Sequence, residues 1–238
     1  MSQDLKTLID QLVSANHILA DQGVLDGFGH VSARIEPGSD RFLLARSMAP
    51  ALVEAEDIIT YDFDGNGLDA EGRTGYLERF IHCEIYRSRP DVMAVVHSHS
   101  QSVIPFGVAE TKLQPMYHMA SFLAQVSKFE IREDFGPGTN MLITSSEMGA
   151  SLAKKLDCNC VTLMRGHGSV AVGGDLKEAV FRAVYTEINA RVQIQAHSLQ
   201  GPLNYLTEEE AMAATTTNRG QHGRCWDLWV AAAREGRK

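Results

Sequence analysis

The chain has 238 residues, of which 44% are hydrophobic and 22% charged, a composition typical of a globular protein with a sizeable core. Its formal net charge of -8 argues against partners that bind a basic surface, so we expect neither a nucleic acid nor a membrane surface. The N-terminal segment lacks the unbroken apolar run of a signal peptide, and no stretch is apolar enough to span a bilayer, which leads us to expect a cytoplasmic protein.

The first part of the chain predicts one helix followed by short strands. Apolar residues at helical spacing over 5–19 indicate a helix that ends near Gly23. Alternation over 29–35 and the apolar run over 41–45 predict a hairpin around the turn at 36–40. Two more elements are expected before the middle of the chain, a strand over 58–63 and a helix over 75–87.

The second part of the chain begins with a dense run of β-forming residues over 92–99, which predicts a central strand. The elements expected after it are a helix over 148–156, strands over 161–164 and 169–172, and a long helix over 176–197. Strands and helices mix without a regular βαβ repeat, which favours an α/β layered fold with a largely antiparallel or mixed sheet. We expect one domain over 1–238, with residues 201–238 forming a C-terminal arm.

His97 and His99 stand where the apolar run changes abruptly to polar residues. On a strand, residues i and i+2 point to the same face, so both imidazoles can reach one ion. This His-x-His arrangement is a recurrent way to bind a borderline divalent metal. Taken alone it is also compatible with two exposed histidines at the end of a polar strand.

A third histidine, His167, lies between Gly166 and Gly168, which permit tight backbone geometry and remove side-chain bulk beside the ring. A turn histidine is the alternative reading. Glu78 falls on the helix expected before the His-x-His strand. It offers the carboxylate that a three-histidine site lacks, as a fourth ligand or as the group that handles protons.

The combination of these motifs resembles the class II aldolase/adducin family over residues 8 to about 200. The strings that carry the resemblance are Gly29-His-Val-Ser-Ala-Arg34, Glu78 before Arg89-Pro-Asp-Val-Met-Ala-Val-Val-His-Ser-His99, and Arg165-Gly-His-Gly168. The resemblance implies a three-layer α/β/α fold with a central, predominantly antiparallel sheet. It also implies an enzyme, commonly a homotetramer with active sites at subunit interfaces.

For the metal, the family resemblance implies one divalent ion per subunit, bound by His97, His99 and His167 with Glu78 as the acidic residue. Zinc, manganese, iron and cobalt all tolerate such a site, so the sequence does not select the metal. The family stabilises an enolate-like oxyanion while a bond to carbon breaks. The metal ligands therefore do not choose among aldol cleavage, epimerisation, dehydration and decarboxylation.

Three substrate-side positions depart from the pattern of the sugar-phosphate enzymes in the family. His30 replaces an asparagine, Ser47-Met48 stands in place of a hydroxyl–glycine pair, and Tyr76-Leu77 replaces a serine pair. Small hydroxyl and glycine residues suit phosphate, whereas tyrosine, leucine and methionine form apolar walls. The sequence therefore disfavours a sugar phosphate and favours a flatter, more apolar anion.

The strings around these positions resemble the aromatic-acid decarboxylase branch of the family, which implies a planar ring with two carboxylates and an ortho hydroxyl. We therefore expect a metal-dependent carboxy-lyase that acts on an ortho-hydroxylated aromatic or pyridine dicarboxylate in aromatic or vitamin B6 catabolism. Glu78 or His30 is the expected proton donor to the ring carbon. The candidates for substrate binding are Arg46, Ser47, Arg165 and His118.

Several of these residues also have plain structural readings. His30 can bond a loop, Ser47 can be a turn residue, and Arg165 can pair with a helix or a neighbouring chain. The main rival function is an aldolase or epimerase acting on a sugar or hydroxy acid with the same metal ligands. An iron-dependent oxygenase and an adducin-like interaction module are the remaining alternatives, although the latter predicts loss of the three histidines.

Overall fold

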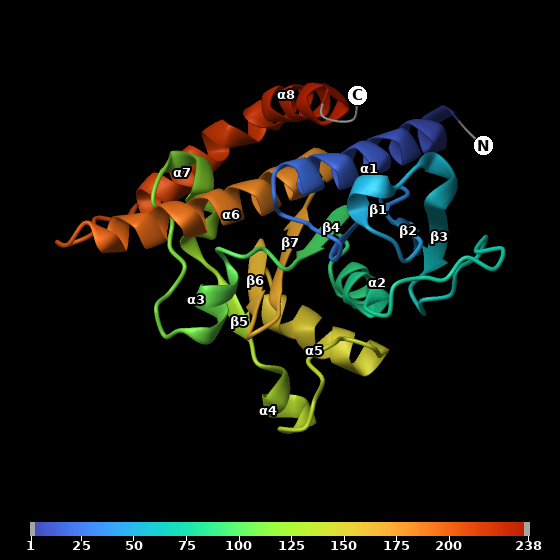
Figure 1. Ribbon diagram of the computed structural model, residues 1–238, viewed down its shortest axis with the longest axis horizontal. Coiled ribbons are helices and arrows are strands. Elements are labelled where there is room, and N and C mark those ends of the chain that lie inside the picture. Colours follow the sequence, from blue (N-terminus) through green and yellow to red (C-terminus); the bar gives the residue numbers. More distant parts are fainter. Residues whose placement is uncertain (1–2, 236–238) are drawn as a thin grey trace.

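The structure, a computed structural model, describes residues 3–235 (Figure 1). In that part of the chain seven strands form one sheet, in the order β3-β2-β1-β4-β7-β6-β5. Every neighbouring pair is antiparallel except β5 and β6. The strands are β1 (His30–Arg34), β2 (Arg41–Ala45), β3 (Ile58–Asp62), β4 (Ala94–Ser98), β5 (Ser127–Phe129), β6 (Val161–Met164) and β7 (Gly168–Gly173).

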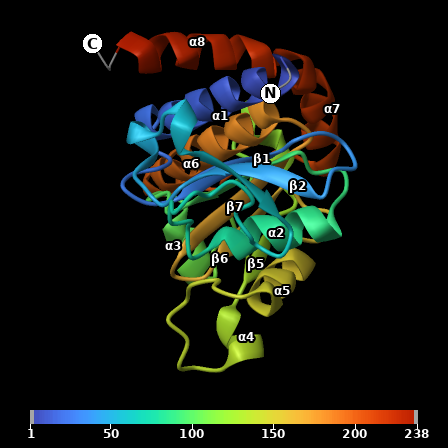
Figure 2. The same cartoon turned by 90° about the vertical axis from the view of Figure 1, so that its right-hand side faces the viewer.

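Helices cover both faces of this sheet, which gives three layers (Figure 2). Helices α1, α6 and α8 pack together on one face, and α2 and α5 pack together on the other. The helices are α1 (Gln3–Asp21), α2 (Arg79–Ser88), α3 (Ile104–Val108), α4 (Ile131–Phe135), α5 (Ser146–Leu156), α6 (Leu176–Ser198), α7 (Glu208–Asn218) and α8 (His222–Glu235). None of the helices within residues 3–235 is both long enough and apolar enough to cross a membrane. The expected three-layer fold with a mostly antiparallel sheet is confirmed.

The central strands are buried because each face of the sheet has its own apolar cluster. All the residues of β1, β4 and β7 are buried. One cluster joins the sheet to α1 and α6, with Phe181 and Val184 among its members, and the other joins it to α2 and α5, with Ile85 and Leu152. Groups at the ends of these strands are therefore held by a rigid, close-packed support.

The C-terminal residues form two helices that pack back onto the structure. Helix α7 begins with a capping box between Thr207 and Glu210 and lies against the 3₁₀ segment at 118–124. Helix α8 lies on α1 and α6, where Trp226 and Trp229 are buried in the apolar cluster. These tryptophans pack in the core and do not line the cavity described below.

Two of the element boundaries that differ from the sequence-based prediction affect the site. Strand β4 ends at Ser98, so His99 is the first residue beyond it. Helix α2 begins at Arg79, so Glu78 stands at its N-cap and not within the helix as the spacing predicts. Gly75 pairs with Arg46 in an isolated bridge, and residues 75–78 precede the helix.

Candidate metal centre and active-site cavity

The three histidines meet at one end of the central strands. His97 is the fourth residue of β4, and the turn from β6 to β7 carries His167 beside it. This turn depends on glycine. Gly166 has a φ of +65°, and a Cβ on Gly168 would lie 2.0 Å from the carbonyl oxygen of Ser98. The sequence therefore lets the turn lie directly against the end of β4.

Glu78 completes the cluster from the start of α2. Within the described residues, Glu78, His97, His99 and His167 each offer one ligand atom, and all four atoms lie within 4.8 Å of one another. Glu78 Oε2 is 3.7 Å from His97 Nε2 and 3.4 Å from His167 Nε2. The other oxygen, Oε1, accepts the backbone N–H of Ile143 at 2.9 Å, which orients the carboxylate.

Four ring nitrogens of this cluster lack hydrogen-bond partners within the described part of the chain. His97 Nε2, His99 Nε2 and both ring nitrogens of His167 are buried without one. Buried polar atoms are normally paired, and an unpaired one costs about 1–3 kcal/mol. Three imidazoles and a carboxylate are also the donor set that a borderline divalent cation prefers. The residues present therefore fit a metal ion.

The protonation states suit the same purpose. Burial lowers the pKa of His97 well below its ordinary value, and its Nδ1 donates to the carbonyl oxygen of Ser169 at 3.2 Å, which leaves Nε2 as a lone-pair donor. Burial alone raises the pKa of Glu78, but the neighbouring His167 and His97 outweigh it and lower that pKa to about 2. His97 thus presents a neutral ring beside an ionised carboxylate.

A cavity of about 320 Å³ opens beside this cluster, a size suited to a small molecule. His30, Ser47, Glu78 and His99 supply its polar groups. The large apolar and aromatic side chains of its wall are Phe28, Met48, Tyr76, Leu77 and Leu142. The three positions at which the sequence departs from the sugar-phosphate pattern therefore all face one cavity.

His30 occupies a defined place in that cavity. It begins β1 and is paired in register with His97 on β4, so its ring centroid lies 5.1 Å from that of His97. The ring of Tyr76 also packs against His30, with 4.6 Å between the two ring centroids. The hydroxyl of Tyr76 donates to the carbonyl oxygen of Met48 at 2.6 Å. Burial lowers the pKa of His30 well below its ordinary value. Its ring is therefore neutral and can carry one transferable proton.

The predicted substrate-binding residues do not all lie at the cavity. Ser47 lines the cavity, whereas Arg46, Arg165 and His118 do not. Arg165 makes a bidentate pair with Glu130, with Nε to Oε2 at 2.6 Å, and Arg46 pairs with Asp57 at 2.6 Å. The side chain of His118 is exposed, next to the end of α7, where Asn218 donates to its carbonyl oxygen. The geometry of this chain thus supports a substrate contact for Ser47 and gives the two arginines structural partners.

Reasoning from the sequence assigned nothing to His82, which the structure places directly behind His30. Its Nε2 lies 2.6 Å from His30 Nδ1 and its Nδ1 lies 2.6 Å from Ser32 Oγ. A signal was present. His30 and Ser32 are two residues apart on a strand, and His82 and Tyr86 are four apart on a helix, so each pair shares a face.

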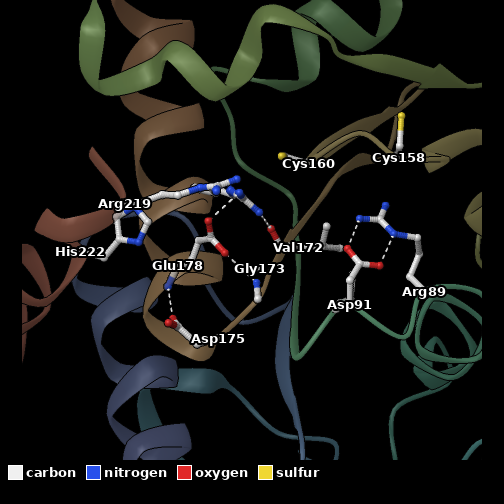
Figure 3. Close-up of a pocket in the computed structure, with 13 residues that line it drawn as sticks. Arg89, Asp91, Cys158, Cys160, Val172, Gly173, Asp175, Glu178, Arg219 and His222 are labelled. Atoms are coloured by element: carbon white, nitrogen blue, oxygen red, sulfur yellow. Dashed lines mark hydrogen bonds and ion pairs between the residues drawn. The ribbon is translucent and has the colours of Figure 1, made fainter. Parts of the chain in front are cut away.

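A larger cavity, of about 540 Å³, lies elsewhere, at the start of α6 (Figure 3). Figure 3 shows Asp91 facing Arg89, and these side chains pair at 2.6 Å. Glu178 pairs with Arg182, also at 2.6 Å. These charged groups satisfy one another, whereas the histidine cluster leaves ring nitrogens unpaired. We therefore place the candidate active site at the smaller cavity.

The sequence matches the model of the family described as Class II Aldolase and Adducin N-terminal domain over residues 10–194. The chain belongs to this family. Among solved structures, the class II aldolase-like fold is shared with an aldolase II superfamily protein from Pseudomonas syringae, with a TM-score of 0.82, 20% identity, and 99% of this chain and 95% of that one covered.

Several curated proteins resemble this class II aldolase family member over most of its length. "Decarboxylase tropJ" of Talaromyces stipitatus is 35% identical, with 94% of this chain and 93% of that protein covered. A 3,4-dihydroxyphthalate decarboxylase of Arthrobacter keyseri is 30% identical, with 84% and 83% covered. The L-fuculose phosphate aldolase of Escherichia coli K12 is 25% identical, with 86% and 89% covered. These relatives are lyases acting on small molecules, which supports a lyase here.

The buried histidines make stability sensitive to acid. Burial lowers the pKa of His82 to about 3, whereas an unfolded histidine titrates near 6.5. Between those values the unfolded chain binds a proton that the folded chain does not. The contribution of the neutral His82 ring to the free energy of unfolding is therefore fully present above pH 6.5. It decreases as the pH falls through this window, by at most about 1.4 kcal/mol per pH unit for one histidine.

We expect the denaturation midpoint of the metal-free wild type to fall more steeply from pH 6.5 to pH 4 than that of a His82→Gln variant. Urea titrations monitored by circular dichroism at four pH values measure both slopes. Equal slopes would contradict the assignment of His82 as a buried neutral ring.

Proposed function

We propose that this protein is a divalent-metal-dependent, non-oxidative decarboxylase of an ortho-hydroxylated aromatic or pyridine dicarboxylate, in aromatic or vitamin B6 catabolism. The main support for this proposal is that the histidine cluster opens into a cavity walled by Phe28, Met48 and Tyr76. Such a wall suits a planar ring and offers few hydrogen-bond donors to a phosphate. The two decarboxylases among the relatives support the same reaction class.

In the proposed site His97, His99, His167 and Glu78 hold the metal. A bound divalent cation supplies positive charge that stabilises the oxyanion formed as the carbon–carbon bond breaks. Phe28 and Leu77 offer an apolar wall to the ring. Ser47 lines the same cavity and offers a hydroxyl to a polar substituent of the ring.

Loss of CO2 leaves an electron pair on a ring carbon, which must take a proton. Glu78 is poorly suited to supply it, because its pKa of about 2 keeps the carboxylate ionised. His30 is better suited, because its neutral ring lines the cavity, with 5.1 Å between its ring centroid and that of His97. Of the two donors expected from the sequence, we propose His30, and we assign Glu78 to the metal.

The cavity gives less support for the binding of a second substrate carboxylate. The lining residues of the cavity include neither lysine nor arginine. A second carboxylate would therefore depend on Ser47, on backbone N–H groups or on a neighbouring subunit. We propose a homotetramer with active sites at subunit interfaces, since Phe28 and Leu77 at the cavity are 70% and 66% exposed in the single chain.

The test is release of CO2 by metal-loaded protein from three acids: 3,4-dihydroxyphthalate, 3-hydroxy-2-methylpyridine-4,5-dicarboxylate and the matched monocarboxylate 2,3-dihydroxybenzoate. We expect turnover of at least one dicarboxylate, with the ring product identified by mass spectrometry. Turnover of the monocarboxylate alone would show that the cavity does not bind a second carboxylate. Light scattering of the same preparation gives the molar mass, for which four subunits of 26.1 kDa are expected.

No CO2 from any of the three acids, with metal bound, would overturn the decarboxylase proposal. The rival reaction is aldol cleavage of a sugar or hydroxy acid, which the similarity to the fuculose phosphate aldolase favours. Release of an aldehyde from a hydroxy acid in a coupled assay would support that rival.

A further inference from the structure

A chain of four buried side chains runs from the cavity along the space between β1 and α2. His30 Nδ1 lies 2.6 Å from His82 Nε2, His82 Nδ1 lies 2.6 Å from Ser32 Oγ, and Ser32 Oγ lies 2.7 Å from the hydroxyl of Tyr86. All four residues are at most 3% exposed. Both ring nitrogens of His82 therefore have a hydrogen-bond partner in this chain of side chains. A packing role alone does not require that arrangement.

The bonding at the far end gives this chain a direction. A neutral imidazole has one donor and one acceptor nitrogen, so the protons can point either all towards the cavity or all away from it. Among the described residues, Ser32 Oγ is the one hydrogen-bond partner of the Tyr86 hydroxyl, so a proton pointing from Ser32 to Tyr86 would leave the buried phenol proton without an acceptor. The hydroxyl proton of Tyr86 is then left for Ser32, because a buried donor needs an acceptor.

From Ser32 the direction carries through to the cavity. The hydroxyl of Ser32 accepts from Tyr86 and donates to His82 Nδ1. His82 Nε2 then carries the proton that it donates to His30 Nδ1. As a neutral ring, His30 has its own proton on Nε2, the nitrogen for which the described residues offer no hydrogen-bond partner and which belongs to a ring lining the cavity.

We propose that Tyr86, Ser32 and His82 form a buried proton relay that holds His30 as an Nε2–H donor towards the cavity. The relay rests on the proposed function only in that decarboxylation uses the proton, since the position of the proton on His30 does not depend on the reaction. Tyr86, Ser32 and His82 act through His30 and are positioning residues.

The proton shift balances at every bond. A C–H bond forms at the ring carbon as the Nε2–H bond of His30 breaks, and His30 Nδ1 takes the proton of His82 Nε2. His82 Nδ1 takes the proton of Ser32, which takes that of Tyr86. The phenolate left on Tyr86 lies beside Arg34, whose guanidinium carbon is 5.0 Å from the ring centroid. After the product leaves, water in the cavity returns one proton through His30.

The position of the proton can be measured without turnover. Nuclear magnetic resonance of the full zinc-loaded chain, labelled with ¹⁵N-histidine, distinguishes a protonated from an unprotonated ring nitrogen by chemical shift. The His30 signals are assigned by their loss in a His30→Gln variant. We expect Nε2 protonated and Nδ1 unprotonated. A proton on His30 Nδ1 would overturn the relay even if the protein proves to be a decarboxylase.

Kinetics test whether the relay contributes to turnover. We expect Tyr86→Phe to lower kcat by about 10-fold or more and His82→Leu by about 100-fold or more, with KM changed less than about threefold. His82→Gln, whose amide can donate to His30 and accept from Ser32, should recover a substantial part of the loss. The matched control is Tyr61→Phe, a buried tyrosine of the same apolar cluster that lies outside the relay, and its kcat should equal that of the wild type.

Bound zinc measured in each variant separates the relay from a general disturbance of the site. Metal content and melting temperature of Tyr86→Phe should match the wild type, since the ring is kept. A wild-type kcat in Tyr86→Phe overturns the relay. If the wild type releases no CO2 from any acid, the proposed function fails, and the proton position on His30 alone decides the relay.

Discussion

His97→Ala should abolish turnover and remove the bound metal. The ring of His97 is fully buried, its Nδ1 donates to the carbonyl oxygen of Ser169, and its Nε2 has no hydrogen-bond partner among residues 3–235. Alanine leaves two histidines and a carboxylate for the ion. We expect metal affinity to fall more than about 100-fold, since loss of an outer-shell partner alone costs 10–100-fold. Metal content by mass spectrometry and kcat check both effects.

The matched control is His197→Ala, which removes an exposed histidine near the end of α6. It should keep the metal stoichiometry and the kcat of the wild type. Both variants need a circular dichroism spectrum, so that loss of the ion is not confused with loss of the fold. A His97→Ala protein that still holds one ion per chain would refute the ligand assignment.

Glu78→Gln should have the second largest effect. Glutamine has the same shape, and its side-chain oxygen can still accept the backbone N–H of Ile143. The change removes the negative charge that lies 3.4 Å from His167 Nε2 and 3.7 Å from His97 Nε2. We expect weaker metal binding. At ordinary metal concentrations we expect kcat to be lower than that of the wild type by up to about 100-fold.

Raising the metal concentration separates the two roles that the sequence left open for Glu78. A pure ligand role predicts that kcat of Glu78→Gln recovers when the ion saturates the site. If kcat stays low at saturation, Glu78 also handles a proton, and the assignment of the donor to His30 alone would be wrong. Titration calorimetry with zinc gives the affinity needed to define saturation.

The sequence predicted the cluster of the candidate metal centre because short-range rules bring these side chains together. His97 and His99 are two residues apart at the end of a strand, and His167 stands between glycines at another strand end. Antiparallel pairing of β4 with β7 then brings these ends together, with Ser98 opposite Ser169. The layered fold followed in the same way from apolar periodicity, and the family membership agrees with it.

The sequence failed where long-range packing decides. Nothing local indicates that Arg165 pairs with Glu130, 35 residues away, or that Arg46 pairs with Asp57, so both appeared free to bind a carboxylate. His82 was passed over for the same reason, since its two partners lie on β1, about 50 residues earlier. Glu78 was placed within a helix because helical spacing fixes the end of a helix poorly.

The support of the ligands and the walls of the cavity come from different parts of the fold. His30 and His97 lie on central strands packed between two apolar clusters, whereas Phe28, Met48, Leu77 and Leu142 come from connecting segments. Exchange of these wall residues alters the shape offered to a ring without disturbing β1 or β4. The same centre can therefore be redirected to new substrates one wall residue at a time, with little loss of stability, by evolution or by engineering.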